Sequence, residues 1–198
     1  ALFAEKDIAA NWGVEEYGRL LKISGGKERM KNYFSEYPDR FPIQLLNEEY
    51  IKELHKRKTE IFIEMCERGQ LPNRPGIKRV VKEAHDEGIR LFVCSTAHKN
   101  SVSSLLKANL GEEYFSWFTD LFCGDDVRAK KPAPDIYNLV KEKYNLKGEE
   151  CFVVEDSRNG LLAAKAAGMH CIVTPSFYSE DEVFTEADIV VSSLGDPL

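Results

Sequence analysis

The stretch Cys151-Phe152-Val153-Val154-Glu155-Asp156-Ser157 begins as an apolar run and ends in two carboxylates and a hydroxyl. A strand without alternating polar residues is typical of a parallel sheet covered on both faces. Shorter apolar runs at 90–94, 121–123, 171–173 and 189–191 alternate with segments of helical periodicity. Strands and helices in turn predict an α/β fold with a parallel sheet. The predicted helices cover residues 77–84, 102–106, 134–144 and 161–167.

A turn-forming segment, Leu71-Pro72-Asn73-Arg74-Pro75-Gly76, divides the chain, because two prolines and a glycine cannot continue a helix. Before this segment, apolar residues recur at helical spacing over 17–23 and 51–65, and nothing has the pattern of a strand. We therefore expect a small all-helical domain over residues 1–71 and an α/β domain over residues 72–198.

Length and composition narrow the classes of function. The 198 residues carry a net charge of −6, which argues against nucleic acid as a partner. No apolar run approaches a membrane-spanning length, so no membrane partner is expected. The cysteines are odd in number and scattered, which favours reduced thiols in an intracellular compartment over a disulfide framework or a zinc site. They are Cys66, Cys94, Cys123, Cys151 and Cys171.

Polar side chains follow two of the predicted strands. Ser95 and Thr96 come after the run 90–94, and Glu155 and Asp156 come after the run 151–154. Ligands of open α/β sheets bind outside the carboxyl ends of the strands. Hydroxyls beside a helix N-terminus suit a phosphate group, and carboxylates suit Mg²⁺. The alternative for Ser95 and Thr96 is ordinary capping of the helix that follows, and the alternative for Asp156-Ser157 is capping of the helix that begins near residue 158. Asp156 could both cap this helix and bind the metal.

A lysine lies between these two strand ends along the chain. Lys131 precedes Pro132, and Pro134 starts the next predicted helix. An ammonium group at this position could offset the charge of a phosphoryl group and of an attacking carboxylate. Lys130 is a competing candidate, but the proline constrains the backbone of Lys131 more closely. The alternative is a solvated loop lysine.

The three segments together are far more specific than any one of them. Ser95 after a strand, then Lys131-Pro132-Ala133-Pro134-Asp135, then Val154-Glu155-Asp156-Ser157 with a following glycine, resembles the haloacid dehalogenase superfamily of phosphatases. The run Gly25-Gly26-Lys27-Glu28-Arg29, after Glu16-Tyr17-Gly18-Arg19-Leu20-Leu21, resembles its CbbY-like branch. That branch comprises sugar-bisphosphate phosphatases associated with Rubisco and is related to the β-phosphoglucomutases. The resemblance extends from about residue 3 to residue 197.

This resemblance implies a Rossmann-like core with a helical cap inserted after the first strand. It implies a Mg²⁺-dependent phosphatase that works through an aspartyl-phosphate intermediate. By resemblance, Ser95 binds the transferring phosphoryl group and Lys131 stabilises its charge. Asp156 would ligate Mg²⁺, with Glu155 as a second metal residue.

The resemblance also assigns residues to the rest of the substrate. Lys27 and Arg29 match positions where such enzymes hold the non-reacting end, and Lys58 matches a similar cap position in the β-phosphoglucomutases. Thr96 and Asn159 are expected to bind substrate as well. The alternative for the cap cations is a solvated helix face. The two glycines before Lys27 favour the binding role, because they permit a close approach of the backbone to a ligand.

One part of the pattern is absent from this sequence. Members of the superfamily start with a strand ending in Asp-x-Asp-Gly, whose first Asp is the nucleophile and whose second is the general acid–base. This chain begins with Ala1 inside the first cap helix, so we expect preceding residues. Asp7 is no substitute, since no buried strand precedes it. We therefore expect either a gap at the sheet centre, between the strands that end at Ser95 and Asp156, or a strand from elsewhere that fills it.

Two classes of function follow. The first is a Mg²⁺-dependent phosphatase of a small sugar phosphate or bisphosphate, xylulose 1,5-bisphosphate-like, whose nucleophile lies outside these residues. The second is a fragment or degenerate homologue that binds phosphorylated ligands without turnover. Among enzymes, the alternatives are a phosphoglycolate phosphatase and a β-phosphoglucomutase-like enzyme. A monomer in the cytoplasm or the plastid stroma is expected.

Overall fold

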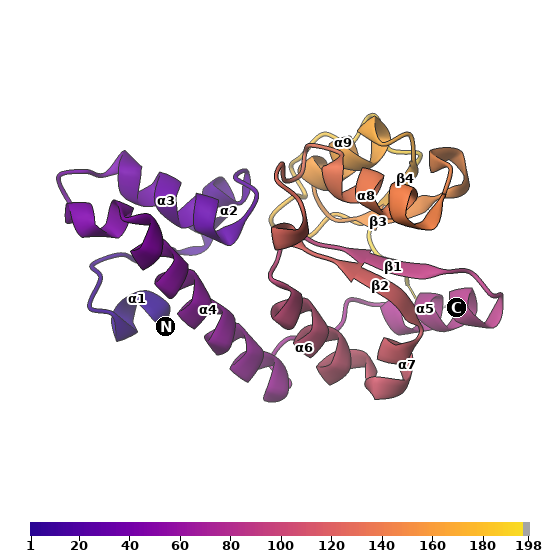
Figure 1. The fold of residues 1–198 in the computed structure, drawn as a ribbon, viewed down its shortest axis with the longest axis horizontal. Coiled ribbons are helices and arrows are strands. Elements are labelled where there is room, and N and C mark those ends of the chain that lie inside the picture. The colour runs from indigo at the N-terminus through magenta and orange to yellow at the C-terminus, as the bar shows by residue number, and fades with distance from the viewer. Residues whose placement is uncertain (196–198) are drawn as a thin grey trace.

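The computed structural model describes residues 1–195 and opens with a purely helical part (Figure 1). The helices predicted at 17–23 and 51–65 are confirmed as α2 and α4. The helix α3 was not predicted, because its sequence is mostly polar and only Met30, Tyr33 and Phe34 are buried. Phe34, Leu20 and Leu54 form the centre of the helical core. The elements are α1 (Leu2–Glu5), α2 (Val14–Leu21), α3 (Gly26–Glu36), the 3₁₀ turn η1 (Ile43–Leu46) and α4 (Glu48–Glu67).

After the proline-containing segment, helices and strands alternate as the sequence predicts. The short helix α7 is the unpredicted addition. The expected α/β domain ends at residue 198, and its last three residues lie outside the described part. The elements are α5 (Ile77–Asp86), β1 (Leu91–Cys94), α6 (Lys99–Leu110), α7 (Glu112–Ser116), β2 (Phe118–Phe122), η2 (Gly124–Asp126), α8 (Asp135–Tyr144), η3 (Gly148–Glu150), β3 (Phe152–Glu155), α9 (Arg158–Ala166), β4 (His170–Val173) and β5 (Ile189–Val190).

The strands form two separate parallel sheets. One has the order β1-β2, with Cys94 opposite Phe122, and the other has the order β3-β4-β5, with Glu155 opposite Val173. Across residues 1–195, β1 and β3 are not paired with each other. The predicted gap between the strands that precede Ser95 and Asp156 is therefore confirmed.

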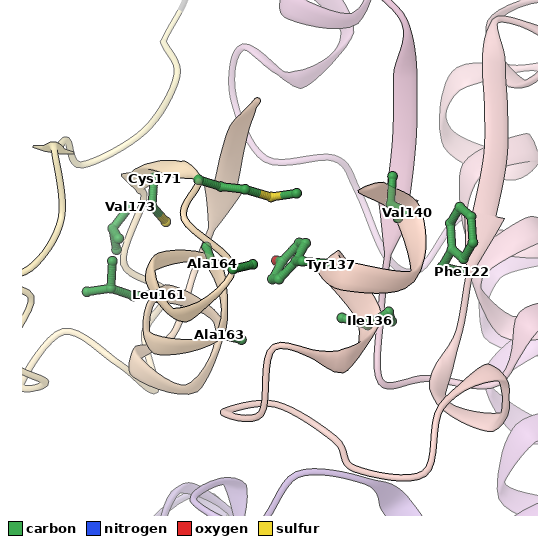
Figure 2. Close-up of a cluster of buried hydrophobic side chains, with 11 residues drawn as sticks. Phe122, Ile136, Tyr137, Val140, Leu161, Ala163, Ala164, Cys171 and Val173 are labelled. Atoms are coloured by element: carbon green, nitrogen blue, oxygen red, sulfur yellow. The ribbon is translucent and has the colours of Figure 1, made fainter. Parts of the chain in front are cut away.

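The main core of the α/β part lies where α8 and α9 cover the second sheet (Figure 2). Ala163 and Ala164 are fully buried, since their small side chains let α9 approach the strands closely. The opposite face of β3 is open, with Phe152 73% and Val154 44% exposed. Parallel strands are normally covered on both faces, so this strand is only half covered.

The segment between α4 and α5 is anchored to the ends of the second sheet. Arg74 donates hydrogen bonds to the carbonyls of Thr174 and Pro175. Gly76 has a φ of 83°, and a Cβ there would lie 2.3 Å from the carbonyl oxygen of Gly195, so only glycine fits. Within residues 1–195, no helix is both long enough and apolar enough to cross a lipid bilayer.

Candidate active site

Lys131 links the ends of the two sheets. The residue is 8% exposed, and its ammonium donates to the carbonyl of Cys94, at the end of β1, over 2.9 Å. It also forms an ion pair with the carboxylate of Glu155, at the end of β3. The Nζ atom lies 4.9 Å from the centre of the Tyr137 ring. The alternative of a solvated loop lysine is therefore wrong for Lys131.

Glu155 turns away from open solvent and into the protein. Its Oε1 atom accepts hydrogen bonds from Lys131 and from the hydroxyl of Tyr137. Its Oε2 atom packs against Gly160, where an added Cβ would lie 1.8 Å away. In this arrangement Glu155 is the ionic partner of Lys131. Its role as a metal ligand stays a prediction.

Asp156 behaves differently from its neighbour. It is exposed and lines a cavity of about 460 Å³. Surrounding protein atoms raise the pKa of its carboxyl, and the nearby Glu155 raises it further, while Lys131 and Arg74 act in the opposite direction. The next residue, Ser157, caps α9 by accepting a hydrogen bond from the amide of Gly160 over 3.3 Å. Asp156 is therefore not the helix cap.

Ser95 and Thr96 open onto the same cavity. The Ser95 hydroxyl accepts a hydrogen bond from the amide of Ala97 over 3.1 Å. The cap of α6 is His98, whose Nδ1 atom accepts from the amide of Asn100. The alternative reading of Ser95 and Thr96 as ordinary helix caps is therefore wrong.

The cavity brings together all three segments that the sequence singles out. It lies at the carboxyl ends of β1 and β3, and the turn between α2 and α3 contributes to its wall. Asn159, another predicted site residue, lines it and donates to the Lys22 carbonyl over 3.2 Å and to the Ser24 hydroxyl over 3.3 Å. Asn159 therefore connects the start of α9 to the helical part. The predicted site residues on its wall include Ser95, Thr96, Lys131, Glu155, Asp156 and Asn159.

The predicted cap cations do not all reach this cavity. Arg29 lines it, while its guanidinium donates to the carbonyls of Leu20 and Ile23 over 3.1 and 3.2 Å. Lys58 instead lines, together with Arg29, a second cavity of about 680 Å³ within the helical part. Burial lowers the pKa of Lys58, and the charge of Arg29 lowers it further.

Lys27 is paired across the two parts of the molecule. Its ammonium lies 2.8 Å from the carboxylate of Asp125 in η2, and this contact lowers the pKa of Asp125. Gly25, just before α3, has a φ of 94°, and a Cβ on Gly26 would lie 2.8 Å from the ring of His55. The two glycines are thus required by the turn and by close packing.

Tyr137 and Arg74 are site residues that the sequence did not reveal. Tyr137 lies on the buried face of α8 and was not singled out by the sequence. Arg74 lines the cavity from the segment that precedes α5. Neither residue belongs to a motif, so spacing alone gave no signal.

The residues at the strand ends fit a Mg²⁺ ion in chemistry. Mg²⁺ is bound by one or two protein carboxylates and keeps several waters. Asp156 offers one accessible carboxylate at the cavity wall. Within residues 1–195, no group of three or more His, Cys, Asp or Glu side chains is placed to hold a metal. Asp156 would therefore supply one ligand of an incomplete set.

Comparison with known proteins agrees with this geometry. A family model described as haloacid dehalogenase-like hydrolase matches residues 2–168. A CBBY-like protein of Arabidopsis thaliana is 46% identical over 98% of this chain, and the chain spans 62% of that relative. The CbbY protein of Cupriavidus necator is 38% identical over 100% of this chain and 78% of its own length.

Solved structures of CbbY from Rhodobacter sphaeroides share the fold. One in complex with phosphate superposes with a TM-score of 0.90 at 38% identity, covering 98% of this chain and 84% of that one. A mutant of the same protein, in complex with xylulose-(1,5)bisphosphate, gives the same values. With a parallel α/β core, strand-end motifs and these relatives, this chain belongs to the haloacid dehalogenase-like hydrolases and, among them, to the CbbY-like proteins.

Proposed function

We propose that this protein takes part in Mg²⁺-dependent hydrolysis of a small sugar bisphosphate of the xylulose 1,5-bisphosphate kind. The observation that carries the proposal is one cavity, lined by Ser95, Lys131 and Asp156, at the carboxyl ends of β1 and β3. The Rhodobacter relative with xylulose-(1,5)bisphosphate bound supports the substrate class.

Each residue has a separate task in this proposal. The Ser95 hydroxyl donates to a phosphoryl oxygen. The buried Lys131 ammonium stabilises negative charge that develops as the phosphoryl group is transferred, and a preorganised charge is most effective in such a site. Asp156 holds Mg²⁺, which supplies a positive charge next to the phosphoryl oxygens. A cation there favours the ionised carboxylate and offsets the surrounding protein atoms that raise the pKa of Asp156.

The attacking group is the missing part. We propose that a further parallel strand fits between β1 and β3 and brings a nucleophilic Asp to the cavity. The support is the lack of pairing between β1 and β3 among the described residues, together with the exposure of Phe152 and Val154. We call the chain preceded by such a strand, ending in Asp-x-Asp-Gly, the strand-extended protein.

The non-reacting phosphate would contact the helical part. Arg29 lines the cavity, and its planar guanidinium can bind phosphate with two parallel hydrogen bonds. When substrate binds, the Lys27 ammonium would leave the carboxylate of Asp125 and pair with the phosphate instead. Lys58 is a more remote candidate, since it lines the neighbouring cavity. A monomeric state and an intracellular location stay predictions.

The test is a panel of sugar mono- and bisphosphates, in which phosphate release by the strand-extended protein is followed with and without Mg²⁺. Mg²⁺-dependent release that is fastest on a bisphosphate is expected. Fastest release from phosphoglycolate would move the assignment to a phosphoglycolate phosphatase, and transfer between positions of a hexose phosphate would indicate a mutase. Phosphate binding without turnover in the strand-extended protein would favour a non-catalytic role.

A further inference from the structure

One carboxylate oxygen beneath the cavity is shared by two donors. The Oε1 atom of Glu155 accepts a hydrogen bond from the Tyr137 hydroxyl and pairs with the Lys131 ammonium. All three groups are enclosed, with Tyr137 4% and Lys131 8% exposed and the Glu155 side chain 9% exposed. Buried charged groups need such partners, because an unpaired one is costly.

The sharing fixes where the ammonium of Lys131 points. One of its hydrogen bonds goes to the carbonyl of Cys94 and one to Glu155, and Lys131 still lines the cavity. An ammonium has three donors, so one remains for a ligand. If the Glu155 carboxylate turned away from Lys131, the ammonium would lose one of the two partners that fix its direction.

Two contacts oppose such a rotation. The Oε2 atom packs against Gly160, which leaves no space for a side chain there. The Oε1 atom is held by the Tyr137 hydroxyl. A tyrosine hydroxyl has one proton to donate, and the Tyr137 hydroxyl donates it to Glu155.

We propose that Tyr137 is a positioning residue: its hydroxyl holds the Glu155 carboxylate against Lys131 and so aims the Lys131 ammonium at the phosphoryl group. The inference rests on the proposed function, because it gives Lys131 a phosphoryl group to contact. It adds that the phosphate affinity of the site depends on a hydroxyl that touches neither phosphate nor metal.

The competing explanation is that Tyr137 is only a satisfied core residue. The chain offers a matched control on the same helix. The hydroxyl of Tyr144 donates to the carboxylate of Asp120 over 3.1 Å, and neither residue lines the cavity. Tyr144→Phe removes a hydroxyl–carboxylate hydrogen bond from α8 just as Tyr137→Phe does, but away from the site.

The experiment is a double-mutant cycle on the strand-extended protein, with inorganic phosphate and Mg²⁺ as the probe in calorimetric titrations. Tyr137→Phe is expected to weaken phosphate binding about tenfold, the effect of one hydrogen bond to a charged group. Tyr144→Phe should leave the affinity unchanged. In the Lys131→Met background, Tyr137→Phe should cause no further loss, because there is no ammonium left to aim.

Equal losses from Tyr137→Phe with and without Lys131 would overturn the proposal, as would an unchanged phosphate affinity in the single variant. Thermal unfolding of the same four proteins provides a second readout. Coupling through Glu155 predicts that the melting temperature of the double variant falls by less than the sum of the two single shifts. If the strand-extended protein without these substitutions binds no phosphate, the proposed function fails, while additive melting shifts would separately refute the contact itself.

Discussion

The strand-end site and the cap cations hold positive charge in two different ways. Lys131 is enclosed, with partners on both sheets and an aromatic ring beside it. Lys27 has a single ionic partner, Asp125, and their side chains are 35% and 52% exposed. A buried ammonium must be matched by its surroundings, whereas an exposed pair contributes little and can exchange. We therefore expect substitutions at the strand-end site to reduce activity strongly, and the cap cations to exchange partners when a ligand binds.

The largest effect is expected from Asp156→Asn in the strand-extended protein. Loss of the carboxylate removes the Mg²⁺ ligand that we propose at the cavity wall, so turnover should be abolished. A titration of activity against Mg²⁺ checks this. A variant that keeps both its rate and its Mg²⁺ dependence would show that Asp156 is not a ligand.

The next largest effect is expected from Lys131→Met, which removes the buried ammonium of the strand-end site. Loss of one preorganised charge should cost about 3 kcal/mol of transition-state stabilisation, measured as a fall in kcat/KM. Lys130→Met is the neighbouring control and should cost much less. The Lys130 ammonium is occupied elsewhere, donating to the Gly124 carbonyl over 2.7 Å and lying 3.6 Å from Glu28. Similar losses in both variants would point to a general charge effect rather than to a site.

Arg29→Ala tests the role of the cap cations in substrate binding. If Arg29 binds the non-reacting phosphate, KM should rise about tenfold for a bisphosphate and much less for the matching monophosphate. Arg29→Lys keeps the charge but loses the planar fork, so it should fall between wild type and Arg29→Ala. Since Arg29 also supports the turn after α2, melting temperatures of both variants serve as the folding control. A proportional loss on both substrates would argue against a distal-phosphate role.

The smallest effect concerns His55, whose ring packs against Gly26. Its pKa is lowered to about 4, mainly by burial and further by the charges of Lys58, Lys27 and His98, while Asp125 acts in the opposite direction. At pH values between about 6.5, its ordinary pKa, and about 4, His55 is protonated in the unfolded chain but neutral in the folded chain. Wild type should therefore lose stability as the pH falls through this window.

His55→Gln removes this titration, so the melting temperature of the variant should fall less than that of wild type between pH 6.5 and pH 4. Thermal unfolding at several pH values in this range measures the difference. If the melting temperatures of the two proteins fell in parallel with pH, the pKa of His55 would not be lowered by its packing between α4 and α3.

Much of the α/β part was predictable, because the apolar runs, the turn residues and the strand-end motifs all indicate one parallel arrangement. The helix α3 was missed because its sequence is mostly polar. Its few apolar residues are recognised as one buried face only in the folded helical core. Two elements of the site could not be predicted for a related reason. The role of Tyr137 depends on a contact between α8 and β3, and the pairing of Lys27 with Asp125 depends on how two distant segments meet.

The alternatives left open by the sequence were settled by local geometry rather than by motif. His98 caps α6 and Ser157 caps α9, which leaves Ser95 and Asp156 available to a ligand. The sequence could not distinguish the metal role of Glu155 from its role as partner of Lys131, because both place a carboxylate at the same strand end. Burial of the pair now favours the second role.

The central claim is that the cavity between the two sheets handles a phosphoryl group once a strand carrying a nucleophilic Asp lies between β1 and β3. The direct measurement is the initial rate of phosphate release from xylulose 1,5-bisphosphate with saturating Mg²⁺, for the 198-residue chain and for the strand-extended protein. The account predicts rapid, Mg²⁺-dependent release by the strand-extended protein and only the buffer rate for the 198-residue chain. Equal rates for the two proteins would contradict it, because the attacking group would then have to come from within the residues described here.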